Sequence, residues 1–313
     1  MSAPPSHIRH ATRGDLPEVV ELLVACDIAE MGEPDTTEED VATDWNEEGF
    51  DLSTDTWVAE GPDGGLTGYA YAGDQMRNGE IEADLWVHPL AGDPGLRDRL
   101  LGLIERRARG MAAARAYGDA AALEVFALAD DRAKRDALSH HGFVPRRTVY
   151  RMRVDLPETV VPPPPPAGID ITTFRAGEDD GVMHSTMNDA FRDHFRQSNE
   201  PLQAWRTRLL GHPDFDPGLW WLAWEAHEAV GALIAYDHGD LGWVKGLGVR
   251  RAWRRRGIGA ALLATAFSAF AARGQRRVEL GVDAEGETRP LHVYEGVGMR
   301  VAHAYELFEK RLA

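Results

Sequence analysis

Apolar residues in the last third of the chain follow two different spacings. The segment WVKGLGV (243–249) is mostly apolar and interrupted by glycine, which predicts a buried strand. Gly246 and Gly248 within it predict a bulge or a close approach of a ligand to the backbone. Further on, apolar residues recur at helical spacing, which predicts a helix from about Gly257 with Gly274 as its C-terminal cap. The apolar positions of this helix are Ile258, Leu262, Leu263, Ala266, Phe267 and Phe270.

Two other segments have the pattern of β-hairpins. They are TWVAEGPDGGLTGYAYAG (56–73), with Gly64 and Gly65 at its turn, and WWLAWEAHEAVGALIAYDHG (220–239). Around each hairpin the coarse order is strand, helix, hairpin, long helix, strand, helix and final strand. This order predicts an α+β fold of α/β layers, in which helices pack on a mixed, mostly antiparallel sheet.

The chain is organised in two halves. Residues 156–168 (LPETVVPPPPPAG) contain five consecutive prolines, which predict a stiff extended linker between a domain at 1–155 and a domain at 169–313. A length of 313 residues is enough for two domains with separate cores. The halves also resemble each other, which indicates duplication of one unit. Matched positions are Gly14 and Gly177, Val87 and Val249, Gly95 and Gly257, and Gly142 and Gly298.

Composition narrows the possible partners. With 34 basic and 51 acidic residues the formal charge is −17, so we expect no nucleic-acid partner. Cys26 is the single cysteine, and the histidines show no zinc-ligand spacing with it, so we expect no metal site. The sequence also contains no apolar run of about 18 residues and no signal-peptide pattern. We therefore expect a cytoplasmic protein with no membrane partner, and the oligomeric state stays open.

The basic segment RRRGIG (254–259) stands out in this acidic chain, because it joins the predicted strand to the predicted helix. A helix N-terminus has unpaired N–H groups and a partial positive charge, so it can bind an anion. Gly257 and Gly259 leave those amides accessible, and the arginines add positive charge. A solvated basic turn is the alternative interpretation of these six residues alone.

Two motifs resemble the GNAT superfamily of N-acetyltransferases. The first is R-x-x-G-x-G at 254–259, which resembles the segment that binds the pyrophosphate of acetyl-CoA. The second is LHVYEGVGM (291–299), which resembles the family's Leu-x-x-Tyr-Glu-x-x-Gly-Met ending. Both motifs lie in the second half in the family's order. The resemblance is weaker for residues 5–155.

The resemblance implies a reaction and a set of site residues. A sheet that opens between strands at 242–249 and 277–282 would hold acetyl-CoA, and an amine of a small molecule would attack the thioester directly. Tyr294 would donate a proton to the departing thiolate. The implied acetyl-CoA-binding residues are Leu247, Gly248, Val249, Arg254, Arg255, Arg256, Gly257, Ile258, Gly259 and Ala260.

The sequence departs from the family pattern at two positions. Trp243 stands where many relatives have a glutamate base, so the base is left open between Asp237, Asp240, Glu279 and water. Gly286 stands where relatives often have an asparagine that contacts the pantetheine arm.

The first half lacks the features that would bind acetyl-CoA. In LAGDPGLRDR (90–99), Gly92, Asp93 and Pro94 replace the three arginines, and Arg97 replaces Gly259. Leu138 falls at the position of Tyr294. We therefore expect a degenerate, non-catalytic first domain that is structural or shapes the substrate cleft.

The acceptor cannot be identified from the residues. Asp189, Asp193 and Glu200 could attract a cationic amine, or they could form a solvated helix face. Phe191, Phe195 and Trp205 are expected in the core or the cleft wall. The tandem layout is similar to that of the mycothiol synthases, which acetylate the cysteinyl amine of a thiol precursor. The alternative to an enzyme is a sensor or scaffold that binds acetyl-CoA without catalysing a reaction.

Overall fold

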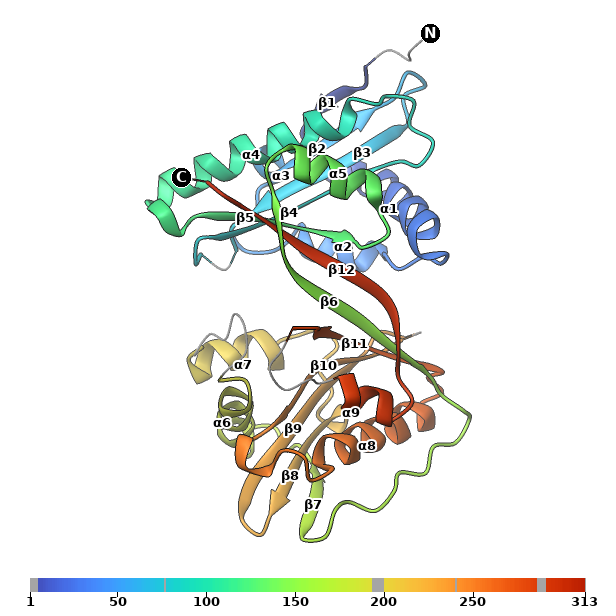
Figure 1. The fold of residues 1–313 in the computed structure, drawn as a ribbon, viewed down its shortest axis with the longest axis vertical. Coiled ribbons are helices and arrows are strands. Elements are labelled where there is room, and N and C mark those ends of the chain that lie inside the picture. The colour runs from blue at the N-terminus through green and yellow to red at the C-terminus, as the bar shows by residue number, and fades with distance from the viewer. Residues whose placement is uncertain (1–4, 76, 193–199, 240, 286–290, 313) are drawn as a thin grey trace. The chain divides into compact units, whose positions relative to one another are not determined.

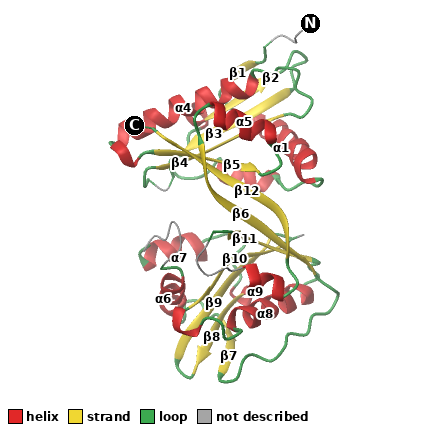
Figure 2. Ribbon diagram, viewed as in Figure 1, coloured by secondary structure: helices red, strands yellow, loops and turns green. Residues whose placement is uncertain are grey.

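The computed structural model describes residues 5–75, 77–192, 200–239, 241–285 and 291–312 (Figure 1). The chain forms two compact units. Unit 1 contains residues 1–148 and 303–313, and unit 2 contains residues 149–302. In each unit helices flank a mostly antiparallel sheet (Figure 2), so the predicted fold class is confirmed. None of the described helices is both long and apolar enough to cross a membrane.

The sheet of unit 1 has the strand order β1-β2-β3-β4-β5-β12. Its strands are β1 (His7–Arg9), β2 (Thr56–Glu60), β3 (Leu66–Gly73), β4 (Glu80–Val87), β5 (Ala122–Leu128) and the part of β12 (Arg300–Arg311) from His303 onward. Its helices are η1 (Arg13–Asp15), α1 (Leu16–Met31), α2 (Glu38–Asp44), α3 (Leu52–Asp55), α4 (Leu96–Arg115), η2 (Gly118–Ala120) and α5 (Arg132–His140). The predicted hairpin at 56–73 is confirmed as antiparallel β2 and β3.

Helices cover both faces of this sheet. Successive strand residues point to opposite faces, and here the side chains on both faces are apolar and need cover. In β2, Val58 belongs to the same core cluster as residues of α1, while Trp57 and Ala59 belong to the cluster that contains α4. Gly68 on β3 lets α4 approach closely, since a Cβ there would lie 3.1 Å from Leu96 Cδ2.

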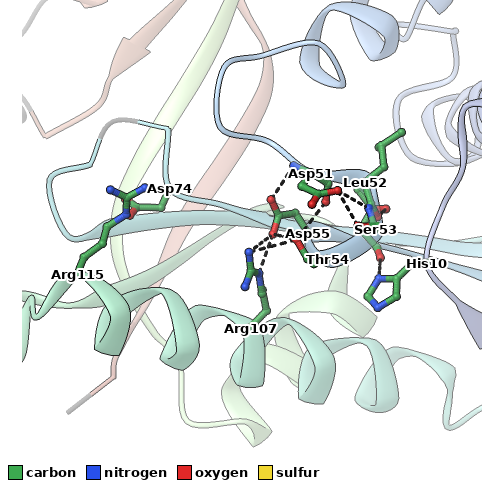
Figure 3. Close-up of polar contacts among 10 residues, drawn as sticks. His10, Asp51, Leu52, Ser53, Thr54, Asp55, Asp74, Arg107 and Arg115 are labelled. Atoms are coloured by element: carbon green, nitrogen blue, oxygen red, sulfur yellow. Dashed lines mark hydrogen bonds and ion pairs between the residues drawn. The ribbon is translucent and has the colours of Figure 1, made fainter.

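A buried ion pair joins α3 to α4 in unit 1 (Figure 3). Asp55 is 1% exposed, and its Oδ1 accepts a hydrogen bond from Arg107 Nε at 2.6 Å. Its Oδ2 accepts from the backbone N–H of Asp51 at 2.8 Å. Figure 3 also shows Arg115 against Asp74, with Nε and Oδ2 2.6 Å apart. Both arginines come from α4, so charged contacts as well as apolar packing fix this helix on the sheet.

The sheet of unit 2 has the strand order β6-β11-β10-β9-β8-β7. Its strands are β7 (Ile169–Thr173), β8 (Trp220–Glu225), β9 (Glu228–Asp237), β10 (Gly242–Val249), β11 (Arg277–Asp283) and the part of β6 (Val144–Asp155) from Val149 onward. Its helices are α6 (Asp180–Ala190), α7 (Leu202–Leu210), η3 (Pro217–Leu219), η4 (Arg251–Trp253), α8 (Ile258–Ala272) and α9 (Leu291–Gly296). The second predicted hairpin is confirmed as antiparallel β8 and β9.

The strand and helix predicted from the apolar spacing are confirmed as β10 and α8. Gly274 has a φ of +91° directly after the C-cap of α8 and ends the helix as expected. The predicted bulge is also present, because the register between β9 and β10 shifts between Val244 and Gly246. The close approach at Gly246 comes from α6: a Cβ there would lie 2.8 Å from Met187 Cε.

Strands β10 and β11 separate soon after they meet. Their parallel pairing joins Gly242 to Val278 and Trp243 to Glu279. No further pairing between these strands occurs in the described residues toward Val249. One edge of the second half of β10 is therefore open to a ligand, as expected for the segment that includes Leu247 and Val249.

Each unit receives its last strand from the opposite half of the sequence. Residues 149–155 of β6 pair antiparallel with β11 in unit 2, and residues 305–311 of β12 pair antiparallel with β5 in unit 1. Met152 and Phe308, at 0% and 2% exposure, bring core side chains with these strands. The compact units therefore differ by one exchanged strand from the expected domains at 1–155 and 169–313, because Val149–Asp155 precedes the proline run and still belongs to unit 2.

Candidate functional site

The connection between β10 and α8 turns sharply through two residues in the left-handed region. Arg255 has a φ of +63° and Gly257 has a φ of +81°. Gly257 is the N-cap of α8 and has no side chain that could accept from the first amides of the helix. The first intrahelical bond runs from Ala261 N–H to Gly257 O at 3.0 Å. The N–H groups of Ile258, Gly259 and Ala260 are therefore available to an anion.

Gly259 lies beside the open edge of β10. A Cβ at this position would be 3.5 Å from Val293 Cγ1, 3.8 Å from Leu247 Cδ2 and 3.8 Å from Val249 Cγ2. These contacts bring the predicted strand residues, the predicted glycine loop and α9 to one end of unit 2. Although far apart in the sequence, the predicted acetyl-CoA-binding segments thus converge in space.

The three consecutive arginines have different partners. Arg254 donates from Nε to Val249 O at 3.1 Å and from an Nη to Ala190 O at 2.8 Å, so it joins the end of β10 to the end of α6. Arg256 donates to Glu225 Oε1 at 2.6 Å. Arg255 is exposed and has no side-chain hydrogen bond or ion pair within the described part of the chain. Arg255 is therefore the guanidinium that is free to meet a ligand.

A small cavity lies beside this loop. Its volume is about 230 Å³, and its lining residues are Asp189, Arg192, Arg250, Arg251, Ala252 and Trp253. Within the described residues, the contacts of the Arg250 guanidinium are long: its Nε lies 3.9 Å from Asp189 Oδ2, and its Nη atoms lie 3.4 Å from Glu228 Oε1 and 3.5 Å from Thr186 Oγ1. The cavity therefore extends the positive region around the start of α8.

Tyr294 lies on α9, next to the Val293 side chain that faces Gly259. The residue is 8% exposed, and burial raises the pKa of its phenol to about 12. The phenol therefore stays protonated near neutral pH and keeps a proton that it can donate.

The structure also limits the choice of a base. Glu279 is fully buried and accepts hydrogen bonds from Arg151 and Arg153, the latter at 2.5 Å. Both arginines come from β6, and Arg151 also lies over the Trp243 ring, 5.6 Å from its centroid. Glu279 is therefore committed to two cations, which disfavours a role as base.

Asp237 and Asp240 are the other carboxyl candidates for the base. Asp237 Oδ1 accepts from Gln275 Nε2 at 2.5 Å and from Gly239 N–H at 3.1 Å. Asp240 and Gly286 lie outside the described residues. No group of three His, Cys, Asp or Glu side chains suited to a metal occurs among residues that the structure describes.

Asp189 and Glu200, two of the acids expected near the acceptor, are already paired. Asp189 forms an ion pair with Arg192, and Glu200 Oε2 lies 2.6 Å from an Nη of Arg208. These pairs favour the solvated-face interpretation over free sites for a cationic amine. Trp205 is 4% exposed and packs against Trp220 in the core, while Asp193 and Phe195 lie outside the described residues.

In unit 1 a carboxylate occupies the position that corresponds to the glycine loop. Asp93 Oδ1 accepts from Gly95 N–H at 3.2 Å, directly before α4. Its Oδ2 accepts from Ser6 N–H at 2.8 Å and from Arg99 at 2.6 Å. These hydrogen bonds oppose the effect of desolvation and lower the pKa of Asp93. The chain thus supplies its own anion at the start of α4.

Sequence reasoning missed the contribution of residues 149–155 to the surroundings of Trp243 and Glu279. The signal was present, because RMRVD (151–155) alternates basic and apolar residues directly before the linker. Nothing in that pattern identifies the sheet that the strand joins.

Comparisons with known proteins agree with this geometry. The model of the "Acetyltransferase (GNAT) family" matches residues 183–299, which include β10, α8 and α9. A mycothiol acetyltransferase of Geodermatophilus obscurus is 30% identical over 265 residues, covering 81% of each chain. One of Streptomyces bingchenggensis is 32% identical over 238 residues, covering 73% of this chain and 72% of the relative.

Solved structures cover nearly the whole chain. A GCN5-related N-acetyltransferase from Sphaerobacter thermophilus has a TM-score of 0.87 and 30% identity over 98% of this chain and 96% of that one. A tandem GNAT protein from the clavulanic acid biosynthesis pathway has a TM-score of 0.73 and 13% identity, covering 98% of this chain and 99% of that one. The second likeness supports the tandem fold alone.

Proposed function

Because the chain belongs to the GNAT family of acetyltransferases, we propose that it transfers the acetyl group of acetyl-CoA to a primary amine of a small molecule, and that unit 2 carries this reaction. Members of the family use acetyl-CoA as the acetyl donor. The observation that carries the assignment to unit 2 is the uncapped N-terminus of α8 beside the open edge of β10. A cytoplasmic location stays a prediction of the sequence.

The proposed binding mode uses backbone groups first. The amides of Ile258, Gly259 and Ala260 bind the diphosphate, and the free Arg255 side chain adds a cation. Arg254 acts indirectly, since its bonds to Val249 O and Ala190 O hold the loop against β10 and α6. The part of β10 that contains Leu247, Gly248 and Val249 has no partner on its β11 side among the described residues, so this edge can receive the pantetheine arm as an edge strand accepts a neighbour.

The reaction requires a neutral amine and a proton for the leaving group. The amine nitrogen attacks the thioester carbon, so that a C–N bond forms and the C–S bond breaks. The nitrogen gives up one proton to water, the departing thiolate takes the proton of the Tyr294 hydroxyl, and water returns a proton to the phenolate. The place of Tyr294 on α9, next to the Val293 side chain that faces Gly259, supports this role, and its pKa of about 12 leaves the phenol protonated at neutral pH.

Replacing Tyr294 by Phe is expected to lower kcat by about 100-fold or more, the usual range for loss of a general acid. KM for acetyl-CoA should change little, because the ring and its packing remain. Thiol release from acetyl-CoA with the best amine substrate measures both constants. An unchanged kcat would remove Tyr294 from the mechanism.

The chain is expected to bind one coenzyme A, because Asp93 fills the corresponding position in unit 1. Calorimetric titration of the full chain should therefore give a stoichiometry of one. The Asp93→Asn variant is the matched control and should also bind one, since Pro94 and Arg97 still oppose a phosphate there. Two equivalent sites in the wild type would contradict a non-catalytic first half.

The acceptor is proposed only as a class. The curated relatives at about 30% identity are named mycothiol acetyltransferases, which favours the amine of a thiol precursor as the first compound to test. Trp243 in place of a strand glutamate argues for testing other amines beside it. Thiol release with a panel of sugar, amino-acid and polyamine amines tests the proposal. Coenzyme A binding without turnover of any amine would favour a sensor or scaffold instead.

A further inference from the structure

Lysine is rare in this chain, and one lysine differs from the others. The sequence contains 34 Lys and Arg residues, of which only Lys134, Lys245 and Lys310 are lysines. Lys134 Nζ lies 2.5 Å from Asp84 Oδ1, and Lys310 Nζ lies 2.7 Å from Glu105 Oε2. Lys245 forms no ion pair with any residue that the structure describes. Of the three lysines, it is therefore the one whose amine is least committed to a partner among the described residues.

The backbone presents Lys245 on the exposed side of a bulge in β10. Val244 is opposite Ala235 and Gly246 is opposite Ile234, so Lys245 is the extra residue of the bulge. The residue is exposed, although the strand is otherwise buried or half-buried. A bulge commonly re-aims a side chain next to a site, and here it directs the lysine toward α7, where Arg208 and His212 interact with it electrostatically.

The surroundings of Lys245 favour the neutral amine. Desolvation lowers the pKa of Lys245, and the Arg208 guanidinium of α7 lowers it further. His212 follows α7 and stacks on Tyr236 of β9, with ring centroids 4.4 Å apart. Two carboxylates of this region are already paired: Asp214 Oδ2 lies 2.8 Å from Nδ1 of His238, and Glu200 Oε2 lies 2.6 Å from an Nη of Arg208.

A second unsatisfied group belongs to the same region. Tyr236 is 2% exposed, and its hydroxyl is buried without a hydrogen-bond partner in the described part of the chain. Burial raises its pKa to about 12, so it remains a neutral phenol. An uncommitted amine and a buried phenol that lacks an acceptor thus lie on the α7 side of β9 and β10.

The geometry connects this lysine with the thioester, and this step rests on the proposed function. If the diphosphate lies at the start of α8, the pantetheine arm runs back along β10 from Val249 toward Leu247. The thioester then lies toward Gly246. Lys245 is two residues before Leu247, about 7 Å along a strand, and its four-carbon stem can span such a distance.

We propose that Lys245 is a self-acetylation site, modified by the acetyl-CoA bound in its own unit. The neutral Nζ attacks the thioester carbon, an amide C–N bond forms and the C–S bond breaks. The proton lost from nitrogen goes to water, and the thiolate leaves as coenzyme A after taking a proton. Acetylation removes an amine that can carry a positive charge from the α7 side of β10.

The test is incubation of the full chain with isotopically labelled acetyl-CoA in the absence of any amine, followed by peptide mass spectrometry. Label is expected on Lys245 at least about 10-fold faster than on Lys134 and Lys310, which serve as internal controls. The Lys245→Arg variant keeps the charge and should lose this label. The Gly259→Asp variant, which puts a carboxylate in the first turn of α8, should label Lys245 no faster than Lys310.

The same preparation is titrated with coenzyme A, so that the two proposals fail separately. Binding of coenzyme A without preferential label on Lys245 would overturn the self-acetylation site and leave the proposed function intact. Equal labelling of Lys245 in the wild type and in Gly259→Asp would also overturn it, because the acetyl group would then come from solution. Absence of coenzyme A binding would overturn the proposed function and this inference with it.

Discussion

The Gly259→Asp variant is expected to bind coenzyme A about 1,000-fold more weakly than the wild type. A carboxylate at this position would stand in the first turn of α8, beside the side chains of Val293, Leu247 and Val249, and would repel a diphosphate bound at the free amides of Ile258 and Ala260. Loss of two charge-assisted hydrogen bonds costs about 3–6 kcal/mol, and about 4 kcal/mol corresponds to 1,000-fold in Kd. Isothermal titration with coenzyme A measures the loss.

This substitution separates binding from folding. A carboxylate in the first turn stabilises a helix by about 0.3–1 kcal/mol, so the thermal midpoint of Gly259→Asp should not fall. Gly259→Ala is the matched control, because a Cβ there meets no atom closer than 3.5 Å and introduces no charge. Its affinity should stay within about 10-fold of the wild type. Tight coenzyme A binding by Gly259→Asp would move the anion site away from α8.

The Glu279→Ala variant is expected to lower the free energy of unfolding of unit 2 by about 3–5 kcal/mol. Glu279 is fully buried, and its removal would take away a carboxylate that contacts Arg151 and Arg153, whose side chains are only 13% and 15% exposed. Urea unfolding followed by tryptophan fluorescence measures the change.

An exposed ion pair provides the comparison. Glu178 pairs with Arg175 at 2.6 Å, but the two side chains are 68% and 64% exposed. Glu178→Ala should therefore cost less than about 1 kcal/mol. Glu279→Gln keeps the shape and one acceptor oxygen, so its cost should lie between the two. A loss below about 1 kcal/mol for Glu279→Ala would show that the arginines find other partners.

Local features of the fold could be predicted from the sequence. The spacing of apolar residues gave the extent of α8, and the glycines of WVKGLGV indicated the bulge in β10. The extent of α8, the bulge in β10 and the positive φ of Gly257 are all determined by residues that are close together in the sequence. The convergence of β10, α8 and α9 followed from the family resemblance and not from spacing alone.

Contacts between distant segments could not be predicted. Arg254 was expected to face a phosphate, yet it donates to Ala190 O, 64 residues away in the chain. The sequence alone leaves Glu279 as a candidate base. Its pairing with arginines could not be predicted, because those arginines lie on β6, in the opposite half of the sequence. An alternating segment such as RMRVD fits any sheet with a free edge, and only the complete fold determines which edge it takes.

The exchanged strands have a consequence for how such a gene can evolve. After a duplication, a copy that loses its ligand is normally free to be deleted. Here, deletion of the first copy would also remove Val149–Asp155, and with it Met152 and the counter-charges of Glu279. Selection that preserves unit 2 therefore also preserves the segment of the first half that supplies this strand.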